Sequence, residues 1–123
     1  MKLYSIVIKI KEKFSDASEE EIVAIINALE AKMVAEIFEP VGILKDKTPL
    51  NAEPDMERDL LLSSEFENLY YYYVLAILSA RDMDIESYEN YSTLFNITYS
   101  ELSLYIRRNN RPVSKTKLGG ISI

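Results

Sequence analysis

The sequence predicts an all-α fold, a small bundle of three to four helices with a long loop after the second helix and an extended C-terminal arm. Its 123 residues include only three glycines and four prolines, too few for the many turns of an all-β sandwich. Three stretches, 19–39, 64–81 and 84–108, repeat apolar residues at three- and four-residue spacing, which is typical of amphipathic helices. This length predicts one helical domain, residues 1–109, followed by the arm, residues 110–123.

Residues 2–14 fit two different patterns. A helical stripe would consist of Leu3, Val7, Ile10 and Phe14. A half-buried strand would consist of the alternating residues Tyr4, Ile6, Ile8 and Ile10. The β-branched side chains favour the strand, but periodicity alone leaves the choice open.

The stretch from about Glu19 to Glu39 is predicted to be a helix. Ser18 precedes it and Glu21 follows three residues later, which is the spacing of a capping box. Three consecutive glutamates in the first turn complement the helix dipole. The apolar face consists of Ile22, Ile26, Leu29, Met33 and Ile37. We expect Pro40 to end the helix.

The long loop, residues 41–62, has no clear periodicity and contains Gly42, Pro49 and Pro54. A connection of this length is uncommon in a compact domain, so the sequence favours a loop that is functional or is ordered by a partner. Three acids alternate within it, namely Asp55, Glu57 and Asp59. They lack the glycine and the distal glutamate of a calcium loop, so we interpret them as a solvated acidic face.

The chain is organised around the stretch from Ser64 to Arg81, which is predicted to be the central helix. Ser64 and Glu67 have the spacing of a second capping box. Apolar residues continue around the whole helix, which predicts burial on more than one side, either by this chain's own helices or by another subunit. The core candidates are Leu69, Tyr73 and Ile77. The subunit-interface candidates are Tyr71, Tyr72 and Leu75, because tyrosine suits such surfaces.

The last predicted helix follows a tight break and should pack antiparallel to the central helix as a hairpin. Asp84 is its N-cap candidate, with Ser87 three residues later, and Arg107 and Arg108 lie in its last turn, where cations complement the dipole. Its inner face consists of Tyr88, Tyr91, Phe95, Thr98, Leu102, Tyr105 and Ile106, broadened by Leu94 and Tyr99. The core candidates in this helix are Tyr88, Tyr91, Phe95 and Tyr99.

Composition argues against several classes of function. The sequence has no cysteine and no histidine, which removes disulfides, thiolate and imidazole metal sites, and the common catalytic triads. Every carboxylate cluster falls at a predicted helix start or in the loop, so we expect no enzyme, no metal and no cofactor. No apolar run approaches the roughly 20 residues that cross a bilayer, so no membrane partner is expected.

Charge is unevenly distributed along the chain. Residues 107–123 contain five bases and no acid, whereas the remainder contains nine bases and twenty acids. The acidic body should repel nucleic acid, while the basic arm could attach to an acidic protein surface or to phosphate. One route to a protein surface is the addition of a strand to an exposed sheet edge. The docking candidates are Arg107, Arg108, Arg111, Lys115, Lys117, Ile121 and Ile123.

A succession of motifs lies between Asp55 and Pro112. An acidic D-M segment with leucines precedes a helix that opens E-x-L-Y-x-Y-Y, and a short acidic turn precedes Y-x-N-Y-x-x-x-F-N-x-x-Y, a pair of arginines and a proline. The residues concerned are Asp55, Met56, Leu61, Leu62, Glu67, Leu69, Tyr70, Tyr72, Tyr73, Tyr88, Asn90, Tyr91, Phe95, Asn96, Tyr99, Arg107, Arg108 and Pro112. This region resembles the small helical head-tail connector, or adaptor, proteins of long-tailed bacteriophages of Gram-positive hosts.

The resemblance implies a structural virion protein that catalyses no reaction. Such connectors form a homo-oligomeric ring of twelve copies under the portal protein and contact a neck stopper or tail-completion protein below. Genomic DNA passes through the ring without specific binding. The protein would be made in the host cytoplasm and located in the neck of the virion, at the head-tail junction. Related chains usually begin with a short helix, which favours a helix for residues 2–14.

Two other classes of function compete with this interpretation. A small helical protein-interaction module, of the inhibitor or anti-repressor type, would use the same tyrosine surface against a host protein. A nucleic-acid-binding protein would use the basic arm, but the sequence offers no basic helix with base-reading side chains, and the acidic body opposes the approach.

Overall fold

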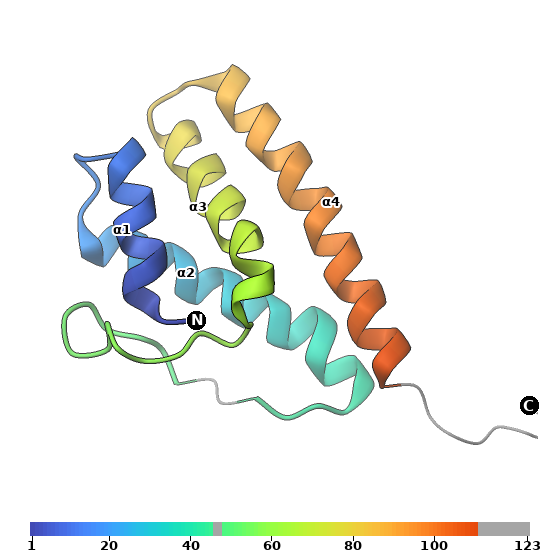
Figure 1. Ribbon diagram of the computed structural model, residues 1–123. Helices are drawn as coiled ribbons and strands as arrows, with labels where there is room; N and C mark the ends of the chain where they lie inside the picture. The colour runs from blue at the N-terminus through green and yellow to red at the C-terminus, as the bar shows by residue number, and fades with distance from the viewer. Residues whose placement is uncertain (46–47, 111–123) are drawn as a thin grey trace, which may run out of the picture.

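The computed structural model describes residues 1–45 and 48–110 and confirms the all-α prediction (Figure 1). Its α-helices are α1 (Leu3–Lys13), α2 (Glu19–Met33), α3 (Glu67–Arg81) and α4 (Ile85–Asn109). A π-helical turn, Val34–Phe38, and a 3₁₀ turn, Glu39–Val41, extend α2, and a second 3₁₀ turn, Ser64–Phe66, precedes α3. The described residues form no β-strand, only one isolated bridge between Lys2 and Asp59.

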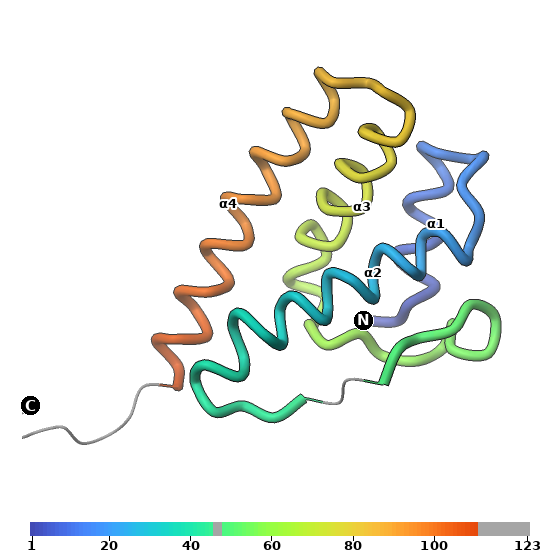
Figure 2. Tube along the Cα trace, turned by 180° about the vertical axis from the view of Figure 1, so that it is seen from behind, coloured from blue at the N-terminus to red at the C-terminus, as the bar shows by residue number. Residues whose placement is uncertain are grey.

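The helices α1, α3 and α4 lie side by side, and α2 crosses behind them (Figures 1 and 2). Helix α3 occupies the centre, with α1 on one side and α4 on the other, and it also contacts α2. The turn between α3 and α4 is tight, so these two helices form the expected antiparallel hairpin. The long loop runs beneath the start of α1 and α3.

Residues 3–13 form a helix because the long loop completes its first turn. The N–H of Leu3 donates to the carbonyl of Arg58 at 3.0 Å, and the N–H of Tyr4 donates to the carbonyl of Met56 at 3.1 Å. The first amides of a helix have no partner within the helix, so these bonds stabilise its start where no side chain caps it. The buried side chains are Leu3, Ile6, Val7 and Ile10.

The N-caps of α2 and α4 follow the sequence prediction. The N–H of Glu21 donates to Oγ of Ser18 at 3.0 Å, and the N–H of Ser87 donates to Oδ1 of Asp84 at 3.2 Å. The predicted helix 19–39 exists over its whole length, but its last part adopts π and then 3₁₀ geometry before it ends at Gly42, whose φ is +81°. Glycine suits this left-handed position because it has no Cβ.

The predicted capping box at the start of the central helix is wrong. Residues 64–66 form a 3₁₀ turn, so α3 begins at Glu67 rather than after Ser64, and Phe66 occupies the N-cap position without a side-chain cap. The carboxylate of Glu67 instead accepts a hydrogen bond from Nζ of Lys9 at 2.9 Å. A contact with α1 has therefore replaced the local cap.

The core departs from the prediction at three positions. Leu75, an interface candidate, is fully buried within this chain, whereas the core candidates Ile77 and Tyr88 are 37% and 39% exposed. The reason is that α1, α2 and α4 surround α3, so its own chain covers most of its apolar perimeter and Ile77 falls in the sector left open. Leu69 and Phe95 are buried as predicted, while the remaining core candidates, Tyr73, Tyr91 and Tyr99, are half-buried and packed against the core.

Candidate functional site

The long loop is attached to α2 by the amide of Asn27. Its Nδ2 donates to the carbonyl of Leu50 at 2.9 Å, and the N–H of Leu50 donates to its Oδ1, also at 2.9 Å. One side chain therefore satisfies both backbone groups of a buried residue, as a neighbouring strand would. This pair orders the loop from within the chain, so the loop does not need a partner for its order at Leu50.

One turn further along α2, Glu30 holds the end of the loop against α3. The hydroxyl of Tyr70 donates to Oε2 of Glu30 at 2.6 Å, and the N–H of Leu61 donates to the same oxygen at 2.7 Å. The N–H of Leu62 donates to the Tyr70 hydroxyl oxygen at 3.3 Å. Burial raises the pKa of Glu30, although the bonds from Tyr70 and Leu61 oppose that shift. Burial, together with the Glu30 charge, also raises the pKa of Tyr70.

A half-buried carboxylate with a raised pKa can mark a catalytic acid or base, so the groups around Glu30 decide its role. A cavity of about 240 Å³ lies beside Glu30. The described residues that line it are Asn27, Glu30, Ala31, Val34, Ala35, Thr48, Pro49 and Leu61, and none of these supplies a cation or an activated nucleophile. The carboxylate is engaged by a tyrosine and a backbone amide of its own chain, so we assign Glu30 to folding. The signal for both loop contacts was present in the sequence, since Asn27 and Glu30 are polar and three residues apart on α2.

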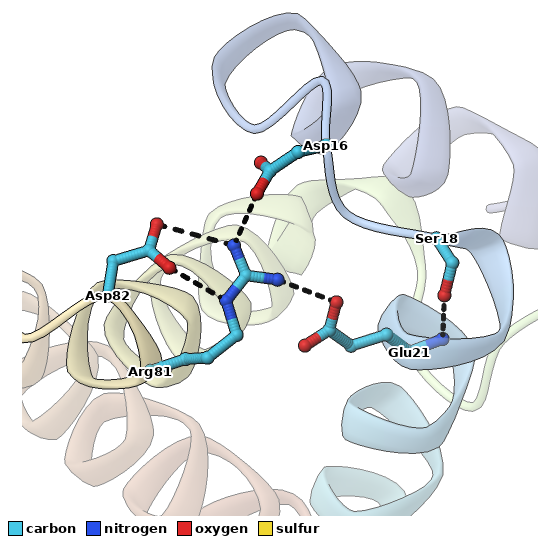
Figure 3. Close-up of polar contacts among 5 residues, drawn as sticks. All are labelled: Asp16, Ser18, Glu21, Arg81 and Asp82. Atoms are coloured by element: carbon cyan, nitrogen blue, oxygen red, sulfur yellow. Dashed lines mark hydrogen bonds and ion pairs between the residues drawn. The ribbon is translucent and has the colours of Figure 1, made fainter.

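At the end of the bundle opposite the long loop, Arg81 links three segments of the chain through hydrogen bonds (Figure 3). Its guanidinium donates to Glu21 at 2.7 Å, to Asp16 at 3.1 Å and to Asp82 at 2.8 Å, linking the end of α3 to the α1–α2 turn and to the start of α2. The hydrogen bonds with Asp82 and Glu21 raise the pKa of Arg81. Three carboxylates around one cation leave a surplus of negative charge at this end. Ser18 lies beside the cluster and caps α2.

The interface candidates Tyr71 and Tyr72 have partners within the chain. Nζ of Lys9 lies 4.8 Å from the ring centre of Tyr71, and the rings of Tyr72 and Tyr91 stack with their centres 6.5 Å apart. Both interface tyrosines are half-buried and packed against the core. Their exposed parts remain available to a partner, but the structure gives each of them a role in packing α3 against α1 or α4.

Helix α4 has a second apolar side that sequence reasoning missed. In its 25 residues only Phe95 and Leu102 are buried. Three further apolar side chains lie on the side that α3 does not cover, with exposed fractions of 40% for Leu94, 53% for Ile97 and 44% for Leu104. Their spacing of three and seven residues places them along one line of the helix, which we call the outer stripe. Leu94 was predicted to broaden the inner face, and its exposure shows that this prediction is wrong. Ile97 and Leu104 lie outside the predicted inner face, and their presence among polar residues was the signal for the outer stripe.

The two ends of α4 carry opposite charge. Asp84 and Glu86 lie at its start, and Arg107 and Arg108 lie exposed in its last turn. The arginines are two of the predicted docking residues, and the helix places them at the end of the bundle where α1 begins (Figure 1). The other docking candidates, Arg111, Lys115, Lys117, Ile121 and Ile123, lie outside the described residues, as does nearly all of the predicted arm 110–123.

Neither a metal site nor a membrane span is present in the part of the chain that the structure describes. Within residues 1–45 and 48–110, no three acidic side chains are grouped closely enough to hold a metal ion. No helix formed by these residues combines the length and the apolar character needed to cross a bilayer. The main unassigned feature of the described surface is therefore the outer stripe of α4 with its basic end.

Comparison with known proteins returns no relative. No protein-family model matches the chain, and no curated protein or solved structure matches it either.

Proposed function

We propose that this chain is a structural neck protein of a bacteriophage, a head-tail connector that assembles as a ring under the portal. The observation that supports the proposal most directly is the outer stripe of α4. One side of this helix packs on α3 through Phe95 and Leu102, while Leu94, Ile97 and Leu104 present apolar area to the outside. Exposed apolar residues aligned on one helix are typical of a surface that associates with protein.

The distribution of charge is compatible with a channel for DNA. The sequence outside residues 107–123 contains twenty acids and nine bases. A ring of such negatively charged bodies would not bind the phosphates of the DNA backbone tightly. Arg107 and Arg108 lie in the last turn of α4, at one end of the bundle. In the proposed assembly this basic end contacts the portal, and the opposite end contacts the stopper or tail-completion protein.

The experiment that tests the proposal is the copy number of this chain in purified virions, measured by quantitative mass spectrometry against the portal protein. Parity with the portal is the expected result, because each portal subunit would carry one connector subunit. Absence of the chain from the particle would overturn the proposal. A soluble host protein that binds the chain would then support the competing class, a small helical inhibitor or anti-repressor.

A further inference from the structure

A second exposed apolar surface lies on α1, at the opposite edge of the molecule from the outer stripe. Ile8 is 58% exposed and Tyr4 is 39% exposed, one helical turn apart. Because α3 lies between α1 and α4, these two surfaces belong to helices at opposite edges of the molecule (Figures 1 and 2). The chain thus carries two different apolar edges, which we call the α1 edge (Tyr4, Ile8 and Glu57) and the α4 edge (Leu94, Ile97, Leu104 and Arg108).

We propose that copies of this chain associate head to tail, with the α1 edge of one copy packed on the α4 edge of the next. The inference rests on the ring of the proposed function and identifies the two surfaces that would close it. A contact between two different surfaces is heterologous, and its repetition produces a ring when the rotation closes. A contact of the α4 edge with itself would instead give a dimer with a two-fold axis.

A pair of opposite charges is compatible with copies that lie side by side in the same orientation. Helix α1 begins at the end of the molecule where α4 finishes, so copies placed side by side in the same orientation bring α1 against α4 in opposite directions (Figure 1). Arg108 lies exposed in the last turn of α4. Glu57 is exposed in the loop segment whose neighbouring carbonyls, those of Met56 and Arg58, accept bonds from the first amides of α1.

Glu57 and Arg108 are therefore of opposite sign at the same end of the two edges. Neither side chain has a hydrogen bond or ion pair with another residue in the described part of the chain. Same-orientation packing brings Glu57 of one copy towards Arg108 of the next, so the contact gains a pair of complementary charges at this end of the two edges.

Cysteine cross-linking tests the pairing directly, because the natural chain contains no cysteine. In the double variant Ile8→Cys/Ile97→Cys, a short bifunctional maleimide should link each copy to the next and give a ladder of multimers. Both side chains are more than half exposed, so the fold should tolerate the changes. The double variant is tested alone and bound to co-expressed portal protein, with circular dichroism to verify its helix content.

Three controls make the result specific. Ile8→Cys alone and Ile97→Cys alone should give no product larger than a monomer, and a dimer from Ile97→Cys alone would overturn the pairing in favour of a two-fold contact. The matched variant Ile85→Cys/Ile97→Cys retains the α4 cysteine and moves the other to Ile85, which is also 58% exposed but lies at the start of α4. It should give no ladder, and a ladder from it would show that cross-linking does not depend on the proposed edges.

Charge reversal supplies an independent readout in the same cross-linking assay. Arg108→Glu should reduce the ladder about twofold to fivefold, the range expected for an exposed ion pair, and added Glu57→Arg should restore it. Loss without restoration would overturn the pairing of these two residues. Assembly of the chain on the portal at parity, with no ladder from Ile8→Cys/Ile97→Cys, would overturn this inference and leave the proposed function standing. A ladder from a chain that is absent from virions would overturn the proposed function instead.

Discussion

In the described part of the chain, two tyrosine–glutamate pairs join helices, and the surroundings of the two pairs differ. Tyr70 donates to Glu30 at 2.6 Å between α3 and α2, whereas Tyr99 donates to Glu36 at 2.8 Å between α4 and the π-helical turn. Burial raises the pKa of Glu30, while the bonds from Tyr99 and Lys32 lower the pKa of the exposed Glu36. The same two groups are therefore part of the interior in one region and part of the surface in the other.

The contrast extends to the regions around the two pairs. The body formed by α1, α2, α3 and the loop contains most of the buried apolar residues, although α1 also exposes Tyr4 and Ile8. Asn27 and Glu30 hold the loop in place. Helix α4 rests on that body along one side and exposes apolar residues on another. Apolar content alone does not distinguish a fully buried helix from a helix with an exposed apolar side. The difference depends on which sides the other helices of the chain cover.

The largest expected effect distinguishes two tyrosines that look alike in sequence. Tyr70→Ala should lower the free energy of unfolding by about 3–5 kcal/mol, because the side chain is fully buried and its loss leaves a cavity and removes one of the two hydrogen bonds of the Glu30 carboxylate. Tyr88→Ala, on α4, should lower it by less than about 1 kcal/mol, because Tyr88 is 39% exposed. Urea denaturation of the two variants measures the difference. Equal losses would show that α4 is as deeply integrated as α3.

The next effect concerns the attachment of the loop. Asn27→Ala should lower the free energy of unfolding by about 1–3 kcal/mol, because both backbone groups of Leu50 lose their partner. Hydrogen exchange should show faster exchange at the Leu50 amide. The matched control is Asn51→Ala, an exposed asparagine in the same loop, which should change stability by less than about 0.5 kcal/mol. Unchanged exchange at Leu50 in Asn27→Ala would show that the loop is held by other contacts.

The elements that sequence reasoning predicted correctly depend on local spacing. The all-α class, the extent of helix 19–39, the caps at Ser18 and Asp84, and the α3–α4 hairpin all follow from residues a few positions apart. The choice of helix for residues 3–13 depends on backbone carbonyls of the loop, more than 50 residues away in the chain, so periodicity left it open.

The parts that sequence reasoning missed depend on tertiary placement. Leu75 is buried and Ile77 is not because of where three other helices lie around α3. Asn27 and Glu30 bind loop residues that belong to no periodic pattern. The predicted interface role of Tyr71 and Tyr72 stays a prediction, as does docking by the basic arm.

A smaller effect is the contribution of Glu30 and Glu36 to the pH dependence of the free energy of unfolding. Glu30 has a raised pKa in the folded state, so between its ordinary value and that raised value the folded protein binds more protons than the unfolded chain. Its contribution to stability therefore falls as pH rises through this window. Glu30→Gln should remove this slope from the unfolding free energy measured against pH. Glu36 has a lowered pKa, so its contribution is present above the ordinary value and is lost as pH falls, and Glu36→Gln should remove a slope of opposite sign. Slopes of the same sign would show that the environments of the two pairs do not differ.

The smallest expected change in stability concerns the exposed apolar side of α4. Ile97→Ser should alter the free energy of unfolding by less than about 0.5 kcal/mol, because its side chain is 53% exposed and leaves no cavity. The matched change on the packed side, Leu102→Ala, should cost about 2–5 kcal/mol, because Leu102 is fully buried. Denaturation measures stability, and sedimentation of the portal complex measures assembly. If Ile97→Ser keeps its stability and loses assembly, the outer stripe serves association. If it loses stability comparably to Leu102→Ala, α4 packs on the body through both sides, and no apolar surface remains for a neighbour.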